Sequence, residues 1–495
     1  MGAMRFLVPR REYLPADALE RAYLAGIDEI PWPGRLRWND DALVVEREQA
    51  DSGNLFIPAL IDGHREVVLS TASLMEREQP YHLDVELARG TLNRLRNYVA
   101  GWESMGSAVR DDIRTAMTAA QTHFSLAATR QDDPMAAAEH AARATRSALD
   151  AMDLLADAYA IEALAARRQQ QGKLSTLVGC NLGSIRPDDA LGRAIAGAFN
   201  SVAVPLVWRD IEAHQGKRDW TTSDAQVEWC RAQGLRMAGG PLLEIDKWSL
   251  PDWMVMWGGD LEGFRSCVAE HVHAVVTRYR GRVQLWHCAA RLNVGNDFGH
   301  DEEQRLRLAA LTIESIRRAD SRAPIVLSVD QPWGAFMSQG HYDLAPLHFV
   351  DALVRAELGL AGIGLEINFA YAPGGSDSRD VLEFSRQIDR FSMLGLPVLV
   401  VITAPSAQEP DPLAASSARA INYSSDTVLS RDAQAAWGEE YLSMLLAKQP
   451  VQAIIWNQLS DSQPHAFAHG GLLDAYGHAK PILEVIRALR GQYTL

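Results

Sequence analysis

The sequence predicts an α/β protein built on a (β/α)8 TIM barrel, preceded by a β-rich module and a helical linker domain. At 495 residues the chain is too long for one ordinary domain and suits a barrel of roughly 250 to 330 residues with accessory parts. From residue 172 to residue 495, short apolar runs alternate with longer amphipathic segments. That order is typical of a parallel sheet covered by helices.

Residues 1–82 are expected to form a small antiparallel β-sandwich. The segments RFLVP, GRLRWN, ALVVERE, GNLFIPALI and REVVLSTASL are short and separated by Pro, Gly, Asn and Asp turn residues. This module is expected either to bind carbohydrate or to pack against one flank of the barrel. Residues 83–171 carry apolar residues three and four apart, which predicts two or three helices, with Asp133 and Pro134 as the start of the last.

The barrel prediction rests on eight candidate strands. They are residues 174–183, 201–208, 235–245, 283–291, 324–330, 362–367, 397–403 and 451–459. Amphipathic segments such as 224–234, 302–320 and 379–395 lie between them and predict the helices. Active sites of this fold lie at the carboxyl ends of the strands, so the polar residues there are the functional candidates.

The net charge of −15 argues against a nucleic-acid or anionic-membrane partner, because it repels phosphate groups. The first 15 residues lack an apolar run long enough for a signal peptide, and no window reaches the roughly 18 to 20 apolar residues of a membrane span. We therefore expect a cytoplasmic protein. The four cysteines, Cys180, Cys230, Cys267 and Cys288, have no metal-ligand spacing, so neither a zinc site nor a disulfide framework is predicted.

The segment GIGLEINFAY, residues 362–371, is the most informative part of the chain. Alternation along a strand places Gly364, Glu366 and Asn368 on one side. An ionised carboxylate is seldom buried without a partner, so Glu366 needs either a structural partner or a chemical role. We expect the chemical role, and a buried ion pair between Glu366 and Arg291 is the structural alternative.

The other strand ends are rich in carboxylates, amides and tryptophans, which suits sugar recognition. Indole faces stack on the C–H surfaces of pyranose rings, and carboxylates and amides form hydrogen bonds with hydroxyls. The structural alternatives are core packing for the tryptophans and a buried inner-barrel position for the histidine. The predicted substrate-binding residues are Trp208, Arg209, Asp210, Trp248, His287, Arg291, Asn293, Gln331, Trp333, Asn368, Tyr371, Trp456 and Asn457.

Motifs for other chemistries are missing. We find no convincing GxGxxG after a strand, no GxxxxGK[ST], no GxSxG and no HExxH. Nucleotide, serine-hydrolase and zinc-protease chemistry therefore lack support, and no cofactor or metal is predicted.

Several segments match the order and spacing of a known family. They are FNSVAVPLVWRDIEAHQGKRDWTTSDAQVEWCRAQGLRMAGG, SLPDW, IDRFSMLGLPV and GGLLDAYGHAKPILEVIRAL. Over roughly residues 178–489 the chain resembles family 10 glycoside hydrolases, the xylanase-type (β/α)8 barrels. The resemblance implies a carbohydrate substrate, and it places Glu366 and Asn368 where family members approach the sugar at the cleavage point.

The two catalytic carboxylates of the family are replaced in this chain. Family members carry their general acid in a W-x-x-x-N-E context on strand four, where WHCAAR has Arg291. Their nucleophile lies in I-T-E-L-D on strand seven, where VVITAPS has Ala404. An arginine cannot donate a proton near neutral pH, and an alanine cannot attack an anomeric carbon. Either other carboxylates have taken over, or the barrel binds saccharide without chemistry.

A relocated pair is geometrically reasonable. Strands three and six are as far apart around the ring as strands four and seven, so Glu244 or Asp246 is expected to face Glu366. Asp330, at the end of strand five, is the other candidate. Carboxyl groups about 5 to 5.5 Å apart would predict retention of configuration, and about 6.5 to 9.5 Å inversion.

Hydrolysis requires one neutral and one ionised carboxyl group. Burial against Trp333 and proximity to Arg291 or Arg209 are expected to separate the two pKa values. Glu366 is predicted to be the nucleophile or base, with Asp330 or a residue of the strand-three pair as the acid. The sequence thus predicts a glycoside hydrolase, with a non-catalytic carbohydrate-binding protein on a decayed barrel as the alternative; it indicates neither the sugar nor the oligomeric state.

Overall fold

The computed structural model describes residues 2–40, 42–49, 51–295, 297–340, 342–419 and 428–495, and it confirms the predicted barrel. Eight parallel strands close in the order β10, β11, β12, β13, β14, β16, β18, β9. Each overlaps one of the eight predicted segments. Their bounds are β9 (Leu177–Asn181), β10 (Ser201–Val204), β11 (Arg236–Gly239), β12 (Leu285–Ala289), β13 (Ile325–Asp330), β14 (Gly362–Asn368), β16 (Val398–Thr403) and β18 (Val451–Trp456).

Side chains from many strands fill the inside of the barrel. Val326, Leu399, Val401, Ala453 and Ile455 form one apolar cluster, and residues of β9, β10 and β12 pack against it. Side chains from strands this far apart around the ring can contact one another only inside the barrel. The residues of this cluster therefore lie on the inner face of their strands. The alternate positions face the helices, which is why the strands read as nearly continuous apolar runs.

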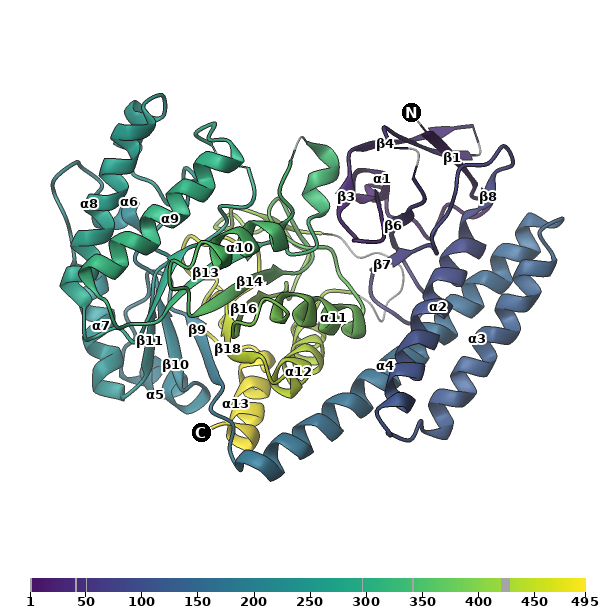
Figure 1. Cartoon of the computed structure of the whole chain (residues 1–495). Helices are drawn as coiled ribbons and strands as arrows, with labels where there is room; N and C mark the ends of the chain where they lie inside the picture. The colour runs from purple at the N-terminus through teal and green to yellow at the C-terminus, as the bar shows by residue number, and fades with distance from the viewer. Residues whose placement is uncertain (1, 41, 50, 296, 341, 420–427) are drawn as a thin grey trace.

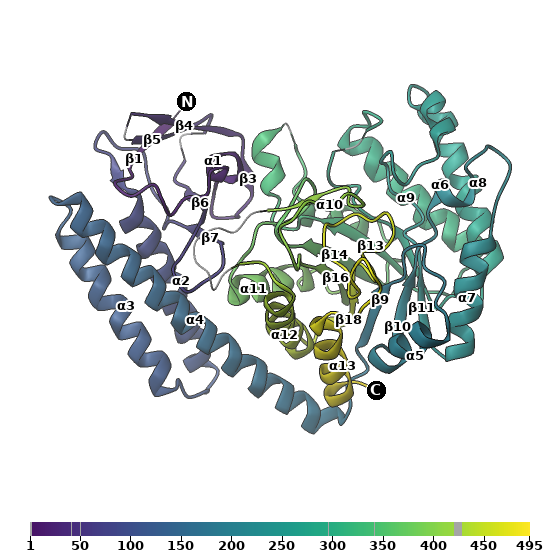
Figure 2. The same ribbon diagram turned by 180° about the vertical axis from the view of Figure 1, so that it is seen from behind.

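Helices form the outer layer of the barrel (Figures 1 and 2). Several begin with an aspartate or serine whose side chain accepts a backbone N–H, and α9 has a complete capping box between Asp301 and Gln304. Among the described residues, none of the helices has the length and hydropathy of a membrane span. The outer helices are α5 (Asp189–Ala198), α7 (Thr221–Gln233), α8 (Leu261–Tyr279), α9 (Glu302–Ala319), α10 (Pro346–Arg355), α11 (Val381–Ser392), α12 (Arg431–Ala447) and α13 (Pro481–Tyr493).

The N-terminal region contains two four-stranded sheets around a common core. One has the order β4, β5, β1, β8 and the other β3, β2, β6, β7. The pairing is antiparallel as predicted, except that β1 and β8 pair in parallel. The strands are β1 (Gly2–Leu7), β2 (Tyr23–Ala25), β3 (Pro31–Trp32), β4 (Gly34–Asn39), β5 (Ala42–Arg47), β6 (Asn54–Ala59), β7 (Val67–Ser70) and β8 (Tyr81–His82), with the short helix α1 (Ala18–Arg21).

Three helices connect the sheets to the barrel: α2 (Leu83–Ser104), α3 (Asp111–Thr129) and α4 (Pro134–Gln171). Asp133 caps α4 by accepting the N–H of Ala136, and Pro134 occupies the first turn, as predicted. The 38 residues of α4 span about 57 Å. Along this length α4 packs against α2 and α3 and then against α11 and α12 of the barrel.

The N-terminal sheets are attached to the loop that follows β14. Arg21 of α1 forms buried ion pairs with Glu66, at 2.5 Å, and with Asp377 of that loop, at 3.0 Å. The N–H of Val68 donates to the carbonyl of Ser378 at 2.9 Å. The strand that carries Glu366 is therefore followed by a loop fixed from outside the barrel.

Candidate active site

Glu366 faces the interior of the barrel at the carboxyl end of β14. In the register of the sheet it lies beside Asp330 of β13 and Val401 of β16, and Val401 belongs to the inner cluster. Neighbouring residues of parallel strands share a face, so all three side chains point inward. Gly364, one inward position earlier, is tightly packed, because a Cβ there would lie 1.9 Å from Ser328 Oγ.

Arg291 pairs with Asp330 and not with Glu366. Its Nε lies 3.4 Å from Oδ2 of Asp330, whose side chain is 1% exposed, while the Arg291 side chain is 31% exposed. No basic nitrogen of the described residues lies within 4 Å of the Glu366 carboxyl oxygens. The ion pair considered as the structural alternative for Glu366 thus involves its neighbour instead.

Asn293 holds the backbone of Asp330 in place. Its Oδ1 accepts the N–H of Asp330 at 2.9 Å, and its Nδ2 donates to the carbonyl of Asp330 at 2.8 Å. The carboxyl Oδ1 of Asp330 accepts the N–H of Gln331, also at 2.9 Å. Asn293 and Gln331, both predicted to bind substrate, therefore position Asp330.

The surroundings of Glu366 and Asp330 affect the pKa values of the two carboxyl groups differently. Burial raises the pKa of Glu366 well above its usual value, the charges of Asp330 and Glu244 raise it further, and Arg291 opposes them. Burial also raises the pKa of Asp330, but Arg291 and the N–H of Gln331 stabilise its ionised form. Of the two carboxyl groups, Glu366 is therefore the more readily protonated, and Asp330 is the one whose ionised form is stabilised by a neighbouring cation. This ordering favours Glu366 as a proton donor, whereas the sequence predicted it as nucleophile or base.

Glu244, in the loop after β11, interacts electrostatically with Glu366, Asp330 and Arg291. Its Oε2 accepts a hydrogen bond from Ser249 Oγ at 2.9 Å. Burial, followed by the charge of Asp246, raises the pKa of Glu244 to about 7. Asp246 itself is engaged in its own loop, where Oδ1 accepts the N–H groups of Trp248 and Ser249, each at 2.8 Å.

Amide side chains at the ends of β14, β18 and β9 contact one another. Nδ2 of Asn457, after β18, donates to Oδ1 of Asn368 at 3.0 Å. Nδ2 of Asn181, at the end of β9, lies 3.5 Å from Oδ1 of Asn457. Asn181 was not among the predicted residues, although alternation from Gly179 would have pointed it inward. A single amide at a strand end is a weak signal.

Three adjacent strands end in non-glycine residues with left-handed backbone conformation. Arg291 follows β12 with φ 62°, Gln331 follows β13 with φ 50°, and Ala370 lies just after β14 with φ 60°. Such conformations cost of order 1–3 kcal/mol each and gather at functional sites. Their position at one edge of the barrel agrees with a site around Asp330 and Glu366.

Two of the predicted stacking tryptophans are packed inside the protein. Trp208 lies against His271, with ring centroids 4.4 Å apart, and its Nε1 donates to Glu212. Trp456 pairs in register with Ile402, one residue beyond the inward Val401, so it faces the outer helices. These two indoles have no open face for a sugar, and core packing describes them.

Trp333 and Tyr371 are also directed away from Glu366. Nε1 of Trp333 donates to Glu383 of α11 at 3.3 Å, and its ring lies near Phe369, with ring centroids 6.0 Å apart. Tyr371 is fully buried and packs against Phe467. Both residues support the loops around the site from outside the barrel.

The remaining predicted residues lie on the loop after β10, on the loop after β11 and on β12. Arg209 bonds to the carbonyl of Lys247 and to Asp252, and Asp210 is exposed. Trp248 is 62% exposed, so it offers an accessible indole face. Burial lowers the pKa of His287 to about 4, which keeps this histidine neutral at pH 7.

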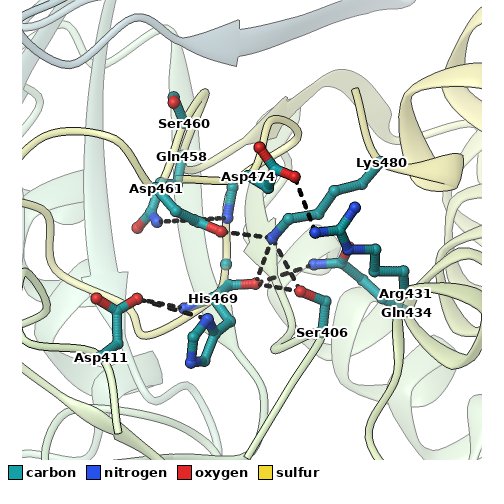
Figure 3. Close-up of polar contacts among 12 residues, drawn as sticks. Ser406, Asp411, Arg431, Gln434, Gln458, Ser460, Asp461, His469, Asp474 and Lys480 are labelled. Atoms are coloured by element: carbon teal, nitrogen blue, oxygen red, sulfur yellow. Dashed lines mark hydrogen bonds and ion pairs between the residues drawn. The ribbon is translucent and has the colours of Figure 1, made fainter. Parts of the chain in front are cut away.

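A buried lysine joins the loops after β16 and β18. Lys480 Nζ donates to Asp461 at 2.6 Å, to Ser406 Oγ at 2.9 Å and to the carbonyl of His469 at 2.9 Å (Figure 3). The carbonyl of Gly470 in turn accepts Thr403 Oγ1 at 2.9 Å. This network, which the sequence did not predict, fixes the rim of the barrel opposite β12.

Comparisons with known proteins agree on the barrel. Residues 183–307 match the model of Glycosyl hydrolase family 10. Endo-1,4-beta-xylanase 3 of Hypocrea jecorina is 24% identical over 117 residues, covering 24% of this chain and 28% of that protein. Endo-1,4-beta-xylanase/feruloyl esterase of Xylanibacter ruminicola is 30% identical over 108 residues, covering 20% of this chain and 14% of that protein. The match thus spans less than a third of either curated relative.

The solved structure of native xylanase 10B from Thermotoga maritima superposes with a TM-score of 0.50 at 16% identity, covering 66% of this chain and 98% of that one. This likeness shows the same fold. The family match extends from the loop after β9 into α9. The matched range includes Arg291 at the end of β12. This position therefore carries a basic residue within the part of the chain that is similar to family 10.

Proposed function

We propose that this protein is a glycoside hydrolase that cleaves a poly- or oligosaccharide at the carboxyl ends of β11 to β14. The observation that carries the proposal is the position of Glu366. It points into the barrel, it has no ion-pair partner among the described residues, and burial together with two neighbouring acids raises its pKa. A neutral carboxylic acid of this kind is what a glycosidic oxygen needs as proton donor.

In the proposed reaction Glu366 is the acid and Glu244 the base. Glu244 removes a proton from water, the water oxygen attacks the anomeric carbon, and the leaving oxygen takes the proton of Glu366. Glu244 suits this role because it is partly exposed and has a pKa of about 7. Asp330 remains ionised beside Arg291, and its charge keeps the proton on Glu366.

The matching relatives suggest the first substrate to test. Both are endo-1,4-beta-xylanases by name, so soluble xylan and xylo-oligosaccharides are suitable, followed by a panel of other polysaccharides. Glu366→Gln is expected to lower kcat about 10²- to 10⁴-fold with a smaller effect on KM. Glu439→Gln, on the exposed face of α12, is the control and should retain activity. Full turnover by Glu366→Gln would refute the assignment.

The second candidate is a carbohydrate-binding protein without catalysis. It is favoured by Arg291 after β12 and Ala404 after β16, the positions that carry carboxylates in the family that the sequence resembles. Calorimetry with the same saccharides, followed by product analysis after long incubation, separates the two candidates. Saturable binding with no reducing ends released would support the binding protein, and product formation that depends on Glu366 would exclude it.

A further inference from the structure

A cavity of about 440 Å³ lies outside the barrel, between the N-terminal sheets and the helices α2 and α4. This volume falls in the usual range for small-molecule sites. The inner walls are mainly apolar, and exposed charged residues of α4 stand at the rim. The wall residues are Leu60, Ile61, Leu69, Leu87, Ala142 and Thr145.

Two buried polar atoms in this cavity have no hydrogen-bond partner within the described parts of the chain. They are Oη of Tyr13 and Oδ2 of Asp84. The two residues are 8% and 7% exposed. Buried polar atoms in folded proteins are nearly always partnered. Two residues that line one cavity and each carry an unsatisfied buried atom therefore point to a third group between the sheets and the helices.

The hydrogen-bonding capacity of Tyr13 Oη and Asp84 Oδ2 indicates which kind of ligand group would satisfy both atoms. Asp84 Oδ2 needs a donor when the carboxyl is ionised, and burial raises its pKa to about 7, so both forms are present near neutral pH. The hydroxyl of Tyr13 stays protonated, because burial raises its pKa well above the usual value. A hydroxyl group is the simplest partner, since it can donate to Asp84 and accept from Tyr13.

The charges around the cavity disfavour ionic ligands. An anionic group would be repelled by Asp84, and a cationic group would meet the half-buried Arg10 in the wall and Arg143 and Arg146 at the rim. Arg146 is paired with Asp62 at 2.5 Å, which ties the loop after β6 to α4. The lining as a whole carries charges of both signs, so a neutral ligand encounters the smallest electrostatic penalty.

We propose that this cavity binds a small neutral molecule with a hydroxyl group and an apolar body. The hydroxyl lies between Tyr13 Oη and Asp84 Oδ2, and the apolar body lies against Leu60, Leu69 and Leu87. The site is separate from the acid cluster of the barrel and needs no catalysis. Because its walls come from the N-terminal sheets, α2 and α4, an occupied site would hold these three parts together.

The test uses four matched probes on the full chain, with binding followed by calorimetry and by the shift in Tm. The probes are 4-propylphenol, propylbenzene, 4-propylbenzoate and 4-propylbenzylamine, which share the apolar body and differ in the polar group. We expect saturable binding of 4-propylphenol and binding at least about tenfold weaker for the other three. Equal binding of propylbenzene, or tighter binding of a charged probe, would overturn the proposal.

Variants assign the binding to the cavity. Tyr13→Phe and Asp84→Asn are each expected to weaken 4-propylphenol about tenfold while leaving propylbenzene unchanged. Tyr98→Phe is the matched control, because Tyr98 Oη is also buried without a partner among the described residues but does not line the cavity. Far-ultraviolet circular dichroism establishes that each variant is folded. An equal loss in Tyr98→Phe, or no loss in either cavity variant, would overturn the proposal.

Discussion

Asp330 and Glu366 are register partners at the carboxyl ends of β13 and β14, and both carboxyl groups lie on the inner face of the barrel. Of the two, only Asp330 has an ion-pair partner among the described residues, Arg291. The single cation therefore stabilises the ionised form of Asp330 more than that of Glu366. The two acids are the centre of the proposed site, and the charge of Glu244, in the loop after β11, acts on Glu366.

The raised pKa of Glu244 predicts a specific pH dependence of stability. The folded-state pKa is about 7 and the usual value is 4.5, so the folded protein binds more protons than the unfolded chain between these values. Stability is consequently lost as the pH rises from about 4.5 through 7. Glu244→Gln has no carboxyl group to titrate and should not show this loss. The free energy of unfolding of the variant minus that of the parent should therefore increase by about 2 kcal/mol from pH 4 to pH 8, after allowance for partial exposure.

Urea unfolding of both proteins at several pH values measures this difference. Glu439→Gln serves as the control, since its side chain is exposed on α12. A difference between Glu244→Gln and the parent that stays constant with pH, or decreases, would show that Glu244 titrates normally.

The close packing at Gly364 predicts that alanine is not tolerated there. A Cβ would lie 1.9 Å from Ser328 Oγ and 2.8 Å from Ser328 Cβ. Gly364→Ala should lower the free energy of unfolding by about 1–3 kcal/mol or more, because β13 and β14 must separate. Adding Ser328→Gly should restore much of the loss, which a double-mutant cycle in urea would measure.

A helical glycine in open space provides the comparison. A Cβ added at Gly491 of α13 would meet no atom of the described residues within 4 Å, so Gly491→Ala should stabilise the protein by about 0.5–1 kcal/mol. If both alanine variants shifted stability in the same direction, steric conflict at Gly364 would not be the cause.

The ion pair between Lys480 and Asp461 is buried, with side chains 2% and 4% exposed (Figure 3). Lys480→Met leaves the Asp461 carboxylate without its cation and should cost about 3–5 kcal/mol of unfolding free energy. Amide hydrogen exchange should accelerate in residues 457–480, because the lysine joins this loop to Ser406.

Arg431→Met is the matched control. Arg431 forms an ion pair with Asp474 at 2.8 Å, but its side chain is 51% exposed. Its removal should cost less than about 1 kcal/mol. A cost for Lys480→Met as small as that of the control would mean that the lysine network adds little to the rim.

The barrel could be predicted because its strands and helices differ in the spacing of apolar residues. β14 illustrates the part of the site that was also predictable: Gly364, Glu366 and Asn368 alternate with apolar residues, which sets their common face. β18 illustrates the limit. The polar residues Gln452 and Asn457 lie on opposite faces of an otherwise apolar run, so the sequence VQAIIWN does not tell whether Trp456 or Asn457 turns inward. The structure directs Trp456 to the helices.

The partner of Arg291 was equally beyond the sequence. Asp330 and Glu366 end adjacent strands, and a long arginine side chain after β12 could reach toward either. The choice depends on the left-handed backbone at Arg291 and on Asn293, which sets the position of Asp330. Both features depend on contacts between residues of different strands, and the residue pattern along a single strand does not predict such contacts.

The helix α4 has a mechanical consequence for the whole chain. This uninterrupted helix of 38 residues packs against α2 and α3 near its start and against α11 and α12 further along. These contacts oppose a hinge motion between the N-terminal part and the barrel, because separating either part from α4 would expose buried apolar residues of the helix. We therefore expect the two parts to melt together, as one calorimetric peak.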